Sequence, residues 1–228
     1  MKSLLKILFK KGFYLAILAC FLGNGLNVSA AKKEQKVDPK ERIETLDNMD
    51  FVTLLNSVDV GNGSELIQKF QNKEGKNRLL NGKFNPSGEC IVESYRNKEI
   101  LLLTIPAHLL FAPNSTELSD GAVEYLQPLK RYLKDPDMYR VVLVMHTDNT
   151  GSVEYRDRLT EDRVNAVFDW FDDNTPDTRY LFSFAMGDDM PLMPNDSMEN
   201  RDKNRRLEIY LVPGQKMVEQ ALQGRIVF

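Results

Sequence analysis

A continuous apolar run, followed by a turn and a helix, constrains the fold of this chain more than any other stretch. Val141–Met145 contains no polar residue, which is typical of a strand buried on both faces. Asp148 follows this run, in a segment of turn-forming residues that ends at Gly151. Apolar periodicity then predicts a helix over residues 153–172. The sequence therefore places a carboxylate where a buried strand gives way to a helix.

Arg163 falls on the apolar face of that predicted helix. It lies four positions after Leu159 and four positions before Val167, so the three side chains share a face. The remaining members of the apolar stripe are Tyr155, Ala166 and Trp170. A lone charge on a core-facing row costs several kcal/mol. We therefore expect Arg163 to pair with Asp148, with an anion of a ligand, or with both.

Further segments of alternating character surround this motif. Residues 91–95 and 100–105 predict a hairpin, and residues 140–146, 180–185 and 206–212 predict three more strands. Ser119 is positioned to cap a helix that runs to Leu133, with Pro128 bending or splitting it. Shorter helices are predicted over residues 39–58, 64–71 and 215–222, a loop over 72–88, and an irregular stretch after residue 185. The alternation predicts a small α/β sandwich.

Five pieces of the chain follow one another in a recognisable order. They are Leu110–Leu118, with an aromatic before an Asn-containing loop; Thr147-Asp148 with Gly151-Ser152; Leu159-Thr160 with Arg163; Gly187–Pro191; and Asn204–Ile209. Together they resemble the OmpA-like C-terminal domain, the module by which outer-membrane and motor proteins of Gram-negative bacteria hold peptidoglycan. The resemblance covers residues 100–212, about half of the chain.

This resemblance implies both a fold and a ligand. The fold is an α/β (α+β) sandwich of βαβαββ type, with two long helices on one face of a mixed sheet. The ligand is the meso-diaminopimelate residue of the peptidoglycan stem peptide, whose side-chain end carries an ammonium and a carboxylate. Asp148 would take the ammonium, and Arg163 would take the carboxylate with its planar fork of donors. Binding would be non-covalent and would need no cofactor.

Other residues are carried over from their positions in the family pattern. Asn114, Thr147 and Arg205 are further candidates for ligand binding. Arg201 would pair with a carboxylate or contact the ligand. A structural ion-pair network is the alternative for Asn204, Arg205 and Arg206, because arginines on sheet edges often do only that.

Several positions depart from the family pattern, namely Met145, Arg156, Val164, Leu110 and Ala112, and the first two bear most on the pocket. Met145 stands where the family usually has Gly, and Arg156 replaces an Asn in the first turn of the helix. A long cation at residue 156 would either block the pocket or add a second contact to an anion. The alternative function is therefore a periplasmic protein-interaction scaffold that kept this fold but lost the peptidoglycan pocket.

The N-terminus indicates export. Four lysines precede an apolar run from Phe13 to Leu22, and Val28-Ser-Ala30 supplies a small-residue cleavage site, as in a secretory signal peptide. A weaker reading is a lipobox at Ile17–Cys20, which would lipidate Cys20. We predict a signal peptide over 1–30, an N-terminal extension over 31–97, a peptidoglycan-binding domain over 98–213 and a tail over 214–228. The expected location is the periplasm, on the cell wall and near the inner face of the outer membrane.

Charge and cysteine content restrict the partners. The formal net charge is −3, and loss of the four signal-peptide lysines would bring it near −7, which disfavours nucleic acid as a partner. Only Cys90 remains after cleavage, so no internal disulfide would form. No nucleophile elbow, phosphate loop or metal-ligand cluster is visible, and His146 with Asp148 and Ser152 makes a poor triad, so we expect no enzyme. An outer-membrane protein partner and a homodimer both stay open.

Overall fold

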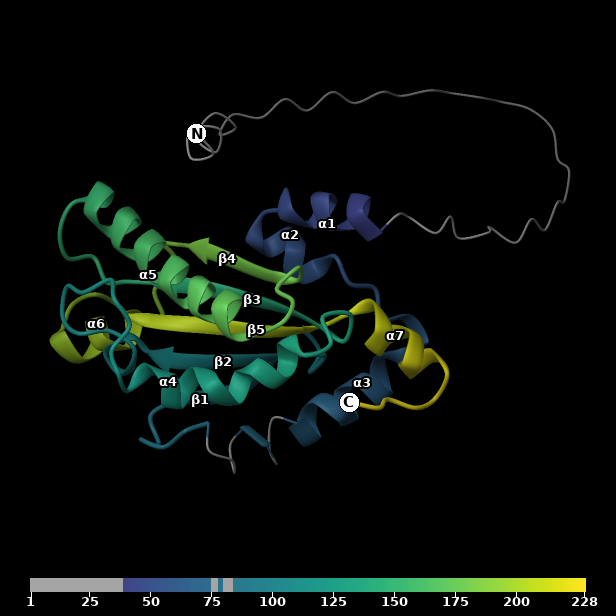
Figure 1. Ribbon diagram of the computed structural model, residues 1–228. Coiled ribbons are helices and arrows are strands. Elements are labelled where there is room, and N and C mark those ends of the chain that lie inside the picture. Colours follow the sequence, from purple (N-terminus) through teal and green to yellow (C-terminus); the bar gives the residue numbers. More distant parts are fainter. Residues whose placement is uncertain (1–38, 75–77, 80–83) are drawn as a thin grey trace, which may run out of the picture. The chain divides into compact units, whose positions relative to one another are not determined.

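Five strands form one mixed sheet in the order β1-β2-β5-β3-β4 (Figure 1). Only the β3–β4 pair is parallel. The strands are β1 (Ile91–Tyr95), β2 (Ile100–Pro106), β3 (Tyr139–His146), β4 (Leu181–Ala185) and β5 (Arg206–Pro213). The computed structural model describes residues 39–74, 78–79 and 84–228, all within the unit Val37–Phe228. Every residue of β3 and β5 is buried, which confirms that the run at 141–145 is a strand covered on both faces.

Helices precede, interrupt and follow the strands. Their bounds are α1 (Pro39–Asp47), α2 (Phe51–Asn56), α3 (Ser64–Glu74), α4 (Ala122–Leu126), α5 (Val153–Asn174), α6 (Met198–Asn204) and α7 (Gln215–Leu222), with 3₁₀ turns η1 (Gly61–Gly63), η3 (Ala107–Leu109) and η4 (Gln127–Leu133). None of the helices within the described ranges is long and apolar enough to cross a membrane.

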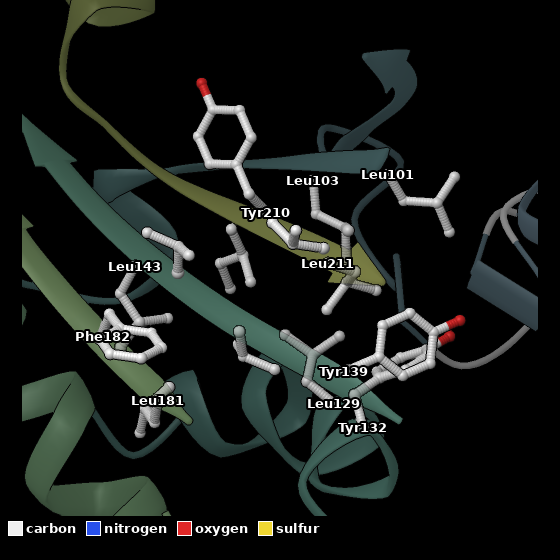
Figure 2. Close-up of a cluster of buried hydrophobic side chains, with 14 of the residues drawn as sticks. Leu101, Leu103, Leu129, Tyr132, Tyr139, Leu143, Leu181, Phe182, Tyr210 and Leu211 are labelled. Carbon is white, nitrogen blue, oxygen red and sulfur yellow. The ribbon is translucent and has the colours of Figure 1, made fainter. Parts of the chain in front are cut away.

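The first face of the sheet is apolar and is covered by α5 and by the α4–η4 run (Figure 1). Side chains alternate along β5, so Leu207, Ile209 and Leu211 point to this face, opposite residues 141, 143 and 145 of β3. The rings of Tyr132 in η4 and Tyr139 in β3 meet edge to face at 5.1 Å. Figure 2 shows this cluster, with Tyr210 projecting to the other side of β5 from Leu211.

The second face is covered at its centre by α2. The ring of Phe51 lies 5.3 Å from that of Tyr210 and 5.8 Å from that of Phe184. The Arg140 side chain donates to Ser57 Oγ over 2.7 Å, just beyond the end of this helix. Burying a Phe side chain contributes about 1.5–3 kcal/mol. The segment before β1 thus supplies part of the core of the sheet.

One edge of the molecule is closed by α3 and α7. Gln71 is fully buried and donates to the carbonyls of Glu99 and Leu211, while its own amide oxygen accepts from Tyr139. These bonds satisfy both polar ends of a buried amide, whose cost would otherwise be high. The N-terminal helices are therefore tied to strands from both halves of the chain.

Most predicted elements are confirmed, with four differences. The hairpin, the three later strands and the helix over 215–222 are present. The predicted cap at Ser119 is wrong, because the helix begins at Ala122 with Gly121 as N-cap, although it does change to 3₁₀ geometry next to Pro128. The helix predicted over 39–58 is divided into α1 and α2, and α3 continues to Glu74. The stretch predicted as irregular after residue 185 contains α6.

The N-terminal predictions lie outside the described residues. These are the signal peptide over 1–30 and the lipidation site at Cys20. Cys90 is described: it is buried, and burial raises the pKa of its thiol to about 12, which keeps it protonated.

Candidate functional site

A pocket of about 980 Å³ opens beside the end of β3. Its walls come from the loop after η3, from the β3–α5 turn, from the first turns of α5 and from α6. All five residues predicted for the ligand line it: Asn114, Thr147, Asp148, Arg163 and Arg205. The other lining residues are Glu89, Ala107, His108, Phe111, Ala112, Pro113, Thr150, Tyr155, Leu159, Met198, Arg201 and Asp202. The structure thus brings together the five predicted side chains, which lie up to 91 positions apart, from Asn114 to Arg205.

Asp148 is held by its own turn and by a distant arginine. Its Oδ1 accepts from the backbone N–H of Thr150 over 2.7 Å, and its Oδ2 forms an ion pair with Arg205. The carboxylate is only 3 % exposed. Burial alone would raise its pKa, but the bonds from Thr150 and Arg205 outweigh burial and lower the pKa below its usual range. Asp148 is therefore ionised at neutral pH.

Arg163 has no such partner. Its Nε donates to the carbonyl of Ser115 over 2.8 Å, a longer contact of 3.4 Å joins Nη2 to the carbonyl of Ala112, and the guanidinium lies 4.9 Å from the centre of the Phe111 ring. No carboxylate of the described residues lies within ion-pair distance of it. The predicted pair with Asp148 is thus not formed, because Arg205 occupies that carboxylate.

The positive charge of Arg163 is consequently buried without a negative charge beside it among the described residues. The side chain is 5 % exposed, and burial lowers the pKa of its guanidinium, with the positive charge of Arg205 acting in the same direction. Carbonyl dipoles and an aromatic ring offset part of the desolvation cost. An anion entering the pocket would offset the rest.

The other predicted residues form the rim and floor. Asn114 is exposed, has a φ of 59°, and its Oδ1 accepts from the hydroxyl of Tyr155 at 3.3 Å. Thr147 is buried, and its N–H donates to the carbonyl of Gly187 over 2.8 Å. Arg205 is bound to Asp202 as well as to Asp148.

The Asn-Arg-Arg segment divides between the pocket and the scaffold. Arg205 lines the pocket, as does Arg201, whose guanidinium donates to the carbonyl of Asn195 at 3.2 Å. Asn204 is fully buried and bonds to both the N–H and the carbonyl of Met193, so it fixes the loop before α6. Arg206 is 2 % exposed and lies outside the pocket lining. Arg206 thus has the structural role of the alternative, Asn204 is structural through hydrogen bonds, and Arg205 forms ion pairs while it also lines the pocket.

Arg206 belongs to a buried network on the second face of the sheet. Its Nε donates to Glu208 over 2.7 Å, and the Tyr210 hydroxyl donates to the same carboxylate over 2.6 Å. His146 Nε2 lies 3.4 Å from Glu208 Oε2, an ion-pair distance without hydrogen-bond geometry. Burial would raise the pKa of Glu208, but His146, Arg206 and Tyr210 together lower it to about 2.

Of the departures from the family pattern, neither Arg156 nor Met145 obstructs the pocket. Arg156 forms a 2.8 Å ion pair with Asp188 and donates to the carbonyl of Gly151, so it braces the β3–α5 turn from outside. Met145 is fully buried in the strand. Neither is among the residues that line the pocket.

The three side chains weighed as a catalytic triad have separate partners. Ser152 caps α5 by accepting from the N–H of Tyr155, Asp148 binds Arg205, and His146 faces Glu208. Within the described parts of the chain, no group of His, Cys, Asp and Glu side chains is placed to hold a metal ion.

Sequence reasoning missed several pocket residues. Tyr155 was assigned to the apolar stripe of α5, yet it lines the pocket, and Phe171 rather than Trp170 is buried at the far end of that helix. Glu89 and His108, which form a 3.1 Å pair, come from outside the motif and carry no local signal. Met198 and Asp202 lie on α6, a helix too short and polar to show apolar periodicity.

The model of the OmpA family matches residues 110–205, the segment that supplies nearly the whole pocket. These residues are an OmpA family domain. Three of the five strands, β1, β2 and β5, lie outside the matched range, so the OmpA family domain of this chain is completed by flanking segments.

Relatives of the OmpA family domain include lipoproteins. "Probable lipoprotein YiaD" of Escherichia coli (strain K12) is 25% identical over 134 residues, which are 59% of this chain and 60% of that protein. "Outer-membrane lipoprotein YfiB" of Pseudomonas aeruginosa is 29% identical over 107 residues, 47% of this chain and 63% of that protein. The chain thus spans less than two thirds of the length of these two relatives.

Solved structures share the fold. A MotB-like protein from Desulfovibrio vulgaris superposes with a TM-score of 0.56 at 23% identity, covering 66% of this chain and 95% of its own. The cell wall anchor of the T6SS from Pseudomonas aeruginosa gives a TM-score of 0.51 at 25% identity, covering 60% and 97%. The predicted fold class is confirmed.

Proposed function

We propose that this chain binds peptidoglycan non-covalently through the diaminopimelate residue of the stem peptide, and so anchors the outer membrane or an envelope partner to the cell wall. One observation carries the proposal: Arg163, a nearly fully buried arginine without a carboxylate partner among the described residues, lines the same pocket as the ionised Asp148. Maintaining an uncompensated buried cation is costly unless a ligand anion completes it.

The chemistry of the diaminopimelate side chain fits this pocket. Its carboxylate matches the planar donors of Arg163, and its ammonium would approach Asp148 from the side left open by Arg205 and Thr150. A lysine at the same stem position has no such carboxylate, so it would leave Arg163 as unsatisfied as it is without ligand. Discrimination of a few kcal/mol against lysine-type stems is expected.

Two kinds of similarity support an anchoring role. The OmpA family domain supplies the pocket, and one structure of the same fold is that of a cell wall anchor. In this proposal the protein is exported to the periplasm by residues 1–30, and the cell wall rather than a small metabolite is its ligand. A link to an outer-membrane partner would come from the extension over residues 31–97, or from a lipid if Cys20 is modified. We propose no catalytic step.

Co-sedimentation with sacculi tests the proposal. The purified mature chain, residues 31–228, is mixed with diaminopimelate-type sacculi and with lysine-type sacculi. We expect it in the pellet with the first kind only. Arg163→Ala and Asp148→Ala should stay in the supernatant while keeping the far-UV circular dichroism of the wild type.

The matched control is Arg158→Ala, which removes an exposed arginine from the same helix and should pellet normally. Wild-type protein that stays in the supernatant would refute the proposal and favour the scaffold function instead. Loss of the fold in both pocket variants would mean that Asp148 and Arg163 are structural.

A further inference from the structure

The two charged groups of the pocket are not equally available to a ligand. Asp148 already accepts one hydrogen bond on each oxygen, from Thr150 and from Arg205. The positive charge of Arg205, paired with Asp148, also opposes the attraction of an ammonium to that carboxylate. Arg163 has only backbone carbonyls and a ring around it. We infer that the pocket recognises the carboxylate of diaminopimelate ahead of its ammonium and accepts stem peptides whose side-chain amine is acylated, as in a cross-link.

This inference rests on the proposed function and specifies which group of the ligand is recognised. A symmetric clamp, with a free Asp148 opposite a free Arg163, would require both groups of the ligand to be charged. In the structure, Asp148 instead holds Arg205 in the wall of the pocket, and Arg205 is held from its other side by Asp202. Asp148 is thus largely a positioning residue for Arg205. Recognition of the ligand then depends mainly on the positive charge of Arg163.

The other charged residues that line the pocket also favour an anionic group of the ligand. Glu89 is paired with His108, and Asp202 with Arg205, so neither carboxylate is without a neighbour. Arg201 also lines the pocket, and its side chain has a backbone carbonyl but no carboxylate as partner among the described residues. Two arginines therefore lack an anion, whereas each acidic group of the lining already has a basic neighbour.

The pocket has room for an acyl group on the amine. A volume of about 980 Å³ is at the upper end of the range for small-molecule sites and is far larger than one amino-acid end group. The lining also includes His108 and Met198, which come from two different segments of the chain. Acylation of the amine removes its charge, and the pocket has space for the atoms of the acyl group that lie next to the new amide bond.

Titration calorimetry with three soluble stem peptides tests the inference. The probes are L-Ala–γ-D-Glu–meso-diaminopimelate, the same peptide acetylated on the side-chain amine, and the same peptide amidated on the side-chain carboxylate. We expect acetylation to weaken binding by less than about tenfold. Amidation should weaken it at least about 30-fold, since it leaves Arg163 buried without an anion.

A variant separates a positioning role of Asp148 from direct contact with the ammonium. Arg205→Met frees Asp148, so the preference for the free amine over the acetylated one should grow in this variant. If acetylation costs the wild type more than amidation does, the inference is overturned while the proposed function stands. If none of the three peptides binds, the proposed function fails and this inference with it.

Discussion

Replacing Arg163 by methionine should uncouple the stability of the fold from ligand binding. The substitution removes a charge-assisted hydrogen bond to Ser115, a weaker one to Ala112 and the contact with the Phe111 ring. Bonds to charged groups contribute about 1.5–3 kcal/mol and a cation–π contact about 0.5–2 kcal/mol. Removing an uncompensated buried charge returns several kcal/mol of desolvation. These terms offset each other, so the free energy of unfolding should change by no more than about 2 kcal/mol.

The effect on binding should be much larger. Losing one partner of a buried, hydrogen-bonded charge pair weakens an interaction by about 2–5 kcal/mol, which is at least about 30-fold in Kd. A stem tripeptide at one hundred times its wild-type Kd should stabilise the wild type by about 2.7 kcal/mol. For Arg163→Met the same concentration should give less than about 1 kcal/mol.

Thermal unfolding with and without the tripeptide measures both quantities. Each kcal/mol corresponds to about 2–4 °C in a domain of this size, so the wild type should gain about 5–11 °C and the variant less than about 4 °C. Arg158→Met, on the exposed side of the same helix, should behave as wild type. The reasoning is refuted if the ligand-free variant loses more than about 4 kcal/mol, or if it keeps the full ligand-induced shift.

Four other substitutions test the fold. Glu208 has a pKa of about 2 against an ordinary 4.5, so its ionised form contributes on the order of 3 kcal/mol to the free energy of unfolding. This contribution is complete above pH 4.5 and is lost as the pH falls towards 2. In Glu208→Gln, the free energy of unfolding measured with urea should therefore depend less on pH over that range. Gly214→Ala would place a Cβ 2.1 Å from the carbonyl oxygen of Asp137, so it should lower the free energy of unfolding by more than about 2 kcal/mol. Gly121→Ala is the control, because a Cβ there meets open space. In the same urea assay it should lower the free energy of unfolding by less than about 1 kcal/mol. Lys98→Gly should raise Tm, gaining about 1 kcal/mol, because residue 98 has a φ of 65°; an unchanged or lower Tm would contradict this.

The sequence predicts where the site residues lie better than it predicts which of them form ion pairs with one another. A buried strand that ends next to Asp148 and a helix that turns Arg163 inward follow from hydrophobic patterning, and both are confirmed. Which arginine pairs with Asp148 depends on where α6 docks. Residues 148 and 205 are brought together by the antiparallel β3–β5 pairing, in which His146 lies opposite Arg206. No local spacing encodes that register, so the sequence left the partner of Asp148 open, with Arg163 as one alternative and Arg205 not among those considered for it.

The fold shows the same division between local and tertiary information. Long or strongly periodic elements were predicted to within a few residues. The cap at Ser119 was wrong because the chain there bonds to the loop before it, where the Ser119 N–H donates to the carbonyl of Leu110. The docking of Phe51 on Tyr210 has no sequence signal, since an apolar residue on a short helix is compatible with many faces.

The central strand of the sheet is also the last one in the chain. Both β2 and β3 bond to β5 and neither bonds to the other. A polypeptide that emerges N-terminus first therefore has two parts of a sheet whose strands are not paired with each other until residues 206–213 appear. The pocket is likewise incomplete until this segment has been synthesised, because Arg205, one of its lining residues, immediately precedes β5. If the chain binds peptidoglycan as proposed, a chain that still lacks residues 205–213 cannot bind it, so binding can begin only after the whole domain has been synthesised.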